Sequence, residues 1–294
     1  MRRMTLYILL GIIISITIAG IAFLHQPSFG RLPKGERLEH IKRSPNYREG
    51  EFRNIDTTIL MTSHKSRLSG IWSFLFRKVE GLRPDEPIPA IKTALRKIPL
   101  EENALVWFGH SSYLLQVDEK RILVDPVFCM ASPVSFVNKP FRGTEIYSPD
   151  DMPDIDYLVI SHDHWDHLDY HTVKQLKGRI GKVVCPLGVG EHFEHWGFDK
   201  SRIIELDWKE SATLSQQFII HCLPSRHFSG RGLTPNQTLW ASFLLETPDR
   251  KIFIGGDGGY GSHLKQIGEQ FPDIDLAILE NGQYNEDWKY IHTM

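Results

Sequence analysis

The chain has 294 residues, 41% hydrophobic and 24% charged, and is long enough to bury a substantial core without a disulfide or a metal ion. Its net charge of −2 argues against nucleic-acid binding as the default function. The three cysteines, Cys129, Cys185 and Cys222, are far apart and odd in number, which excludes a disulfide framework and a CxxC metal site.

An uncharged apolar segment lies near the start of the chain. Residues 5–24 contain no charged side chain and follow Arg2 and Arg3. A helix of about 20 residues rises about 30 Å, which matches the hydrocarbon thickness of a bilayer. The poor small-x-small site at Ala19–Ala22 favours an uncleaved, single-pass anchor over a signal peptide. Basic residues on both flanks leave the membrane side of the following chain open.

A basic region, residues 25–100, joins this segment to the rest of the chain. It has 15 Lys/Arg and 8 Asp/Glu, a net charge of +7, whereas residues 101–294 have 17 and 28, a net charge of −11. Polar, proline-interrupted sequence predicts a linker or an extended arm from Gln26 to about Glu51. The aromatic stretch 68–78 is interpreted as a contact with lipid headgroups or as a helix packed on the following domain.

The compact domain spans residues 101–294 and combines short β-rich runs with helices. The first three strands are expected to be successive antiparallel neighbours. The order of elements indicates two sheets flanked by helices. We expect strands at 104–108, 112–117, 121–125, 157–160, 182–185, 202–206, 217–223, 239–246, 251–255 and 275–279, and helices at 169–177, 188–196 and 261–271.

A dense group of potential metal ligands follows the strand at 157–160. His162, His164, Asp166 and His167 lie within six residues, and imidazole and carboxylate suit zinc and similar divalent ions. The two histidines that are two residues apart can turn to one side of an extended loop, and the Asp-His pair can face a second ion. The spacing therefore predicts a two-metal hydrolytic site, in which ions about 3.5–4 Å apart share an activated water. A polar loop with clustered histidines is the alternative.

Three later segments add one candidate ligand each: His227, Asp257 and His292. The first two directly follow predicted strands, and loops at strand ends are where sites on layered folds are found. Taken singly, His227 or His292 would more often be a surface or core histidine. Together with the first motif they predict one composite site.

The ordered ligands His162-x-His164-x-Asp166-His167, His227, Asp257 and His292 resemble those of the metallo-β-lactamase fold hydrolases. This family has an αββα sandwich with a binuclear metal site. Motifs at 107–112, 125–126, 226–231, 238–242 and 256–260 are most similar to the branch that contains N-acylphosphatidylethanolamine-hydrolysing phospholipase D and its bacterial relatives. The resemblance covers about residues 50–294 and implies an α/β sandwich in that part of the chain. Together with the apolar segment at residues 5–24, it leads us to expect a hydrolase domain that a transmembrane helix anchors in a bacterial inner membrane.

The resemblance also implies a role for each site residue. One ion would be held by His162, His164 and His227, the other by Asp166, His167 and His292, and Asp257 would bridge both. Two divalent ions are expected as cofactors, zinc first, although iron or manganese suits the same ligands. Asp166 and Asp257 are the predicted catalytic residues, because either can orient a metal-bridged hydroxide or take its proton. Arg226 and Arg231 are predicted to bind substrate phosphate, or else to form structural salt bridges, and His110 is expected to support the site.

These observations lead us to expect a membrane-anchored phosphodiesterase of the phospholipase D type, acting on N-acylphosphatidylethanolamine or a related phospholipid. A lactone or ester hydrolase and an inactive, membrane-tethered metal-binding protein are the alternatives. The expected partners are the substrate and the membrane, without nucleic acid, because the acidic domain would repel a phosphate backbone; monomer and homodimer both stay open. Relatives continue beyond the position of Met294, so we expect a C-terminally incomplete sandwich with His292 on a frayed end.

Overall fold

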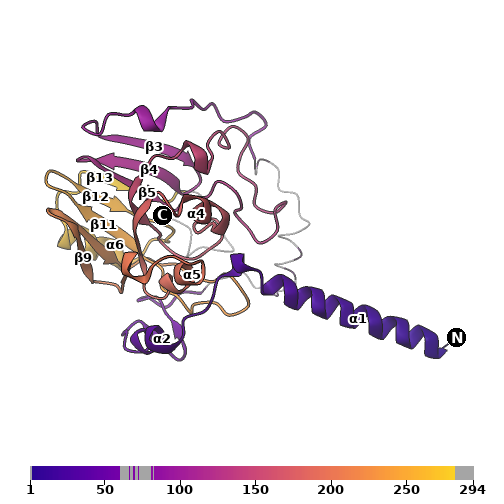
Figure 1. The fold of residues 1–294 in the computed structure, drawn as a ribbon. Coiled ribbons are helices and arrows are strands. Elements are labelled where there is room, and N and C mark those ends of the chain that lie inside the picture. Colours follow the sequence, from indigo (N-terminus) through magenta and orange to yellow (C-terminus); the bar gives the residue numbers. More distant parts are fainter. Residues whose placement is uncertain are drawn as a thin grey trace.

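The computed structural model describes residues 2–59, 66, 69, 72, 81 and 83–281. Helix α1 (Arg2–Leu24) projects away from the folded domain (Figure 1). Its stretch Met4–Leu24 is long and apolar enough to cross a membrane, and none of it is buried against the protein. An N-terminal signal sequence has the same properties, so the helix is a candidate for either a membrane anchor or a signal sequence.

The first sheet has six strands in the order β3-β4-β5-β6-β7-β8. Its first three strands are antiparallel neighbours, as predicted, whereas β5 to β8 run parallel. Parallel neighbours need a crossover connection, which a long segment supplies between β5 and β6, helix α4 between β6 and β7, and helix α5 between β7 and β8. The parallel strands therefore end at one edge of the sheet. The bounds are β3 Ala104–Gly109, β4 Ser112–Val117, β5 Lys120–Val124, β6 Ile155–Val159, α4 Tyr170–Leu176, β7 Ile180–Pro186, α5 Gly190–His195 and β8 Ile203–Leu206.

The second sheet has five strands in the order β13-β12-β11-β10-β9. All neighbours are antiparallel except β12 and β13, which are connected through helix α6. Strand β9 was not predicted, because its sequence is short and mostly small and polar. The bounds are β9 Ser211–Ser215, β10 Phe218–Leu223, β11 Ser242–Glu246, β12 Lys251–Ile254, α6 Ser262–Gln270 and β13 Leu276–Ile278.

Three apolar clusters hold these layers together. The largest lies between the sheets and joins Val159 of β6 to Phe243 of β11. A second packs α4 and α5 onto the first sheet, and a third packs Ile267 of α6 against Phe253 of β12. The apolar run at residues 157–160 is explained by this arrangement, because both faces of the strand are buried: Leu158 belongs to the second cluster and Val159 to the first. The predicted αββα sandwich is confirmed.

The region predicted as a linker or an extended arm contains short elements of regular structure. It contains the turn η1 (Pro27–Phe29), helix α2 (Gly35–Ile41) and the hairpin strands β1 (Tyr47–Arg48) and β2 (Glu51–Phe52). Ile41 and Phe52 are fully buried in the core between the sheets, where each apolar side chain contributes roughly 1.5–3 kcal/mol. The aromatic stretch 68–78 falls almost wholly outside the described residues, so its two interpretations stay predictions. Single 3₁₀ turns lie at Leu95–Lys97 (η2), Pro149–Asp151 (η3) and Lys200–Arg202 (η4).

Candidate metal centre

The histidine-rich loop leaves the sheet at the end of β6, beside the end of its parallel neighbour β5. The carboxylate of Asp125, one residue after β5, accepts hydrogen bonds from the N–H and the O–H of Ser161 at 2.8 and 2.6 Å. Both residues are 1% exposed. Two adjacent strand ends thus fix where the loop begins, and we call residues 162–167 the metal loop.

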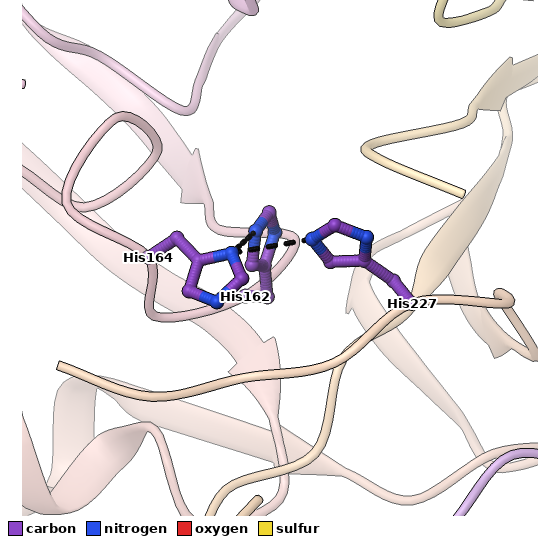
Figure 2. Close-up of side chains that lie close together, drawn as sticks. All are labelled: His162, His164 and His227. Atoms are coloured by element: carbon purple, nitrogen blue, oxygen red, sulfur yellow. Dashed lines mark hydrogen bonds between the residues drawn. The ribbon is translucent and has the colours of Figure 1, made fainter. Parts of the chain in front are cut away.

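Three imidazoles converge at this edge. His162 and His164 come from the metal loop and His227 from the loop after β10, and their rings point at one another in Figure 2. His162 Nε2 lies 2.9 Å from His164 Nδ1, and His227 Nε2 lies 3.2 Å from the same atom. Two nitrogens on one tetrahedral zinc, each about 2.0–2.1 Å from it, are about 3.3 Å apart. The donor set and its spacing therefore suit a divalent ion.

A second group of ligand atoms adjoins the first through Asp257, in the loop after β12. Asp257 Oδ2 lies 3.2 Å from His167 Nε2 and 3.9 Å from His227 Nε2. On the other side of the ring, His167 Nδ1 lies 2.9 Å from Asp125 Oδ2. Because Asp125 accepts the Nδ1 proton, Nε2 is the nitrogen left to face a metal ion. One carboxylate thus lies between two groups of imidazoles.

Asp166 lies on the exposed side of this second group. Its Oδ2 is 3.2 Å from Nε2 of His110, whose side chain is 54% exposed. The potential ligand atoms of His110, Asp166 and His167 all lie within 4.8 Å of one another. This position suits the supporting role predicted for His110.

Burial and charge distinguish the imidazoles. Burial lowers the pKa of His162 well below its usual range, and the neighbouring rings of His167 and His164 lower it further. Burial also lowers the pKa of His164, against the opposing effect of Asp166 and Asp163. Both rings are therefore neutral near pH 7, which is the form that binds metal.

His167 behaves in the opposite way. Although burial lowers its pKa, the carboxylates of Asp257 and Asp125 raise it well above the usual value. Burial also opposes ionisation of Asp257, yet His167 and His227 hold its pKa well below the usual range. Two carboxylates around one ring favour an additional positive charge, which either a proton or a metal ion can supply.

The structure brings together six of the seven predicted metal ligands. His292 lies outside the described residues, so its role stays a prediction. Arg226 donates to the carbonyls of Tyr260 and Thr57, and its predicted contact with substrate also stays a prediction. Those brought together are His162, His164, Asp166, His167, His227 and Asp257.

Arg231 has a different position from the one predicted. It is 5% exposed, and its guanidinium donates to the main-chain carbonyls of Ser28, Asp163 and Leu168. These contacts give Arg231 a structural role beneath the metal loop, which is closer to the structural alternative than to phosphate binding. Its described contacts are with main-chain carbonyls and aromatic rings, not with the salt-bridge carboxylates that the alternative supposed.

Sequence reasoning gave no role to two residues that hold ligands in place. Asp125 orients His167, and the signal available for it was an acidic residue and a proline directly after a buried strand. Asn54 accepts from the N–H of His227 at 3.1 Å and donates to its carbonyl at 2.8 Å. Because Asn54 lies in the arm, far from His227 in sequence, no local pattern pointed to it.

Comparisons with known proteins place the chain in a protein family. Residues 120–294 match the family described as Beta-lactamase superfamily domain. An uncharacterised protein of Mycobacterium tuberculosis is 40% identical over 256 residues, which are 85% of this chain and 68% of that protein. The N-acyl-phosphatidylethanolamine-hydrolyzing phospholipase D 1 of Caenorhabditis elegans is 32% identical over 197 residues, 62% of this chain and 54% of that one. A metal-dependent hydrolase of Pyrobaculum neutrophilum is 25% identical over 181 residues, 60% of this chain and 70% of that one.

Proposed function

The chain belongs to the beta-lactamase superfamily and is a metal-dependent hydrolase, and from that premise we propose that it is a membrane-anchored phosphodiesterase with two metal ions. We propose further that its substrate is N-acylphosphatidylethanolamine or a related phospholipid, cleaved between phosphate and headgroup. The similarity to the nematode phospholipase D over 62% of this chain supports the substrate class.

The observation that carries the two-ion proposal is the position of Asp257. Its Oδ2 is close to both His167 and His227, at 3.2 and 3.9 Å, so one carboxylate can serve two ions. His162, His164 and His227 would hold the first ion, and Asp166 and His167 would hold the second. Zinc suits this set of imidazole and carboxylate donors best.

Bound ions would supply Lewis acidity and lower the pKa of a water molecule towards 7. Hydrogen bonding to His110 and the charge of His167 hold the pKa of Asp166 well below its usual range, although burial opposes this. Asp166 is therefore ionised at neutral pH and could accept a hydrogen bond from the attacking water and orient it. His110, whose Nε2 lies 3.2 Å from Oδ2 of Asp166, would hold this carboxylate in place.

The position of the anchor favours a lipid substrate. Phe29, five residues after the end of α1, packs its ring edge-on against Trp165 of the metal loop, with centroids 4.9 Å apart. If α1 spans the bilayer, the metal loop lies close to the membrane surface. A lipid headgroup would then reach the site without leaving the membrane.

The proposal is tested with zinc-loaded protein in mixed micelles that contain N-acylphosphatidylethanolamine. We expect release of phosphatidic acid, and we expect its loss in Asp257→Asn, which keeps the size of the side chain but weakens its ability to bind two ions. A panel of lactones and simple esters is assayed in parallel. Hydrolysis of the lactones with no release of phosphatidic acid would refute the lipid assignment and leave the hydrolase assignment intact.

A further inference from the structure

We propose that the five residues Pro27–Arg31 position the metal loop, so that a displacement of helix α1 changes the geometry of the metal centre. We call these five residues the juxtamembrane segment. Only His25 and Gln26 separate this segment from the end of α1. The proposal rests on the metal centre described above and does not depend on the lipid substrate.

The first connection runs through Asp163, which lies between the ligands His162 and His164 in sequence. Its carboxylate is buried and accepts from the N–H of Gly230 at 2.7 Å and from His192 Nε2 at 3.0 Å. His192 Nδ1 in turn accepts the main-chain N–H of Arg31 at 3.1 Å, so the ring proton must lie on Nε2, directed at Asp163. With its proton on Nε2, the ring of His192 thus forms one hydrogen bond to the juxtamembrane segment and one to the metal loop.

The second connection is the buried guanidinium of Arg231. Its Nε and Nη2 donate to the carbonyl of Ser28 at 3.1 and 2.7 Å. Its Nη1 donates to the carbonyls of Asp163 and Leu168 at 2.9 and 2.6 Å. A buried cation needs all of these acceptors, because water cannot replace a lost one. Displacement of Ser28 would therefore disturb the contacts of Arg231 with Asp163, near the start of the metal loop, and with Leu168, directly after it.

Aromatic contacts form the third connection. Phe23 in the last turn of α1 meets Phe29 edge-on with centroids 5.2 Å apart, and Phe29 meets Trp165 in the same way. The guanidinium of Arg231 also lies over the ring of Trp165, 4.2 Å from its centroid. Trp165 lies between two predicted ligands in sequence. A shift of the juxtamembrane segment would therefore move Trp165 and, with it, the neighbouring predicted ligands His164 and Asp166.

Two glycines of the arm provide a matched test. Gly30 has φ +70°, and a Cβ there would lie 2.1 Å from Nδ1 of His192. Gly35 has φ +57°, and a Cβ there would meet nothing within 4 Å. Both glycines have a positive φ, so alanine is strained at either position, but only Gly30→Ala must also push the segment away from His192. The comparison therefore tests the contact with His192, which is hydrogen-bonded to Asp163 of the metal loop.

The experiment measures zinc affinity of the full-length protein in detergent by competition with a chromophoric chelator. We expect Gly30→Ala to weaken zinc binding about 10- to 100-fold, the range typical when groups that orient metal ligands are removed. We expect Gly35→Ala to stay within about twofold of wild type, since nothing contacts its Cβ. Thermal unfolding of the zinc-free proteins checks that both variants fold.

Phe29→Ala is a second variant, which adds no backbone strain, and it should also weaken zinc binding. Its control is Leu32→Ala, at an exposed position. Equal zinc affinities in Gly30→Ala and Gly35→Ala, together with an unaffected Phe29→Ala, would overturn the inference. A loss of zinc-free stability without a change in zinc affinity would do the same, because it would show a purely structural contact. Wild-type protein that binds no zinc would overturn both the inference and the proposed metal centre.

Discussion

Replacement of Asp125 by asparagine should selectively impair the metal group that contains His167. The carboxylate accepts three hydrogen bonds, two from Ser161 and one from His167 Nδ1, all between 2.6 and 2.9 Å. An asparagine of the same size has only one acceptor oxygen and places an NH₂ group against donors. With this NH₂ group against Nδ1, His167 avoids the conflict by moving its proton to Nε2, the nitrogen that faces Asp257.

The size of the effect follows from burial. Asp125 is 1% exposed and His167 is fully buried, so an unmatched donor there costs about 1–3 kcal/mol. This corresponds to a loss of roughly 5- to 150-fold in affinity for the ion held by His167, which agrees with the roughly 10- to 100-fold found when partners of metal ligands are removed. The ion held by His162, His164 and His227 should be affected much less.

Zinc titration with a chelator, followed by elemental analysis at limiting zinc, resolves the two sites. We expect Asp125→Asn to retain about one zinc under conditions in which wild type retains two, as the proposed two-ion site requires. Ser161→Ala is the control, because it removes one of the three hydrogen bonds without reversing the proton on His167. Full retention of both ions in Asp125→Asn would refute the assignment of the His167 tautomer to Asp125.

Three further predictions concern other parts of the molecule. Arg37→Ala should lower the free energy of unfolding in urea by about 3–5 kcal/mol, because Arg37 pairs with the buried Glu191 and two other carboxylates. Lys42→Ala is the control and should change the free energy of unfolding much less, because the Lys42–Glu39 pair is exposed to solvent. Burial lowers the pKa of His263, so below about pH 6.5 the unfolded chain binds a proton that the folded chain does not. Stability should therefore fall as the pH drops, and less steeply in His263→Asn, in chemical denaturation at pH 7.5 and 5.5. Asp257→Ala should lower the zinc content of the protein, and an unchanged content would contradict its bridging position.

The metal loop could be predicted from the sequence because its signal is local. Several ligands fall within six residues directly after an apolar strand, and the strand end fixes their direction. His227 and Asp257 were identified in the same way, each after a strand of the second sheet. Strand β9 was missed because it lacks an apolar periodicity and is defined by pairing with β10. The local sequence pattern was therefore sufficient where the potential ligands directly follow a strand.

The arm shows why the long-range contacts that support the metal centre could not be predicted. Helix α2 has seven residues, too few for a convincing amphipathic period, and the partners of Arg37 and Asn54 lie more than 150 residues further along the chain. Only the closed sandwich brings these residues to the metal loop and to His227. A region that reads as a connector therefore supplies part of the support of the metal centre. Removing residues 1–56 as an anchor and linker would therefore remove contacts of the metal centre itself. A shortened protein should retain more zinc when it begins at residue 25 than when it begins at residue 57.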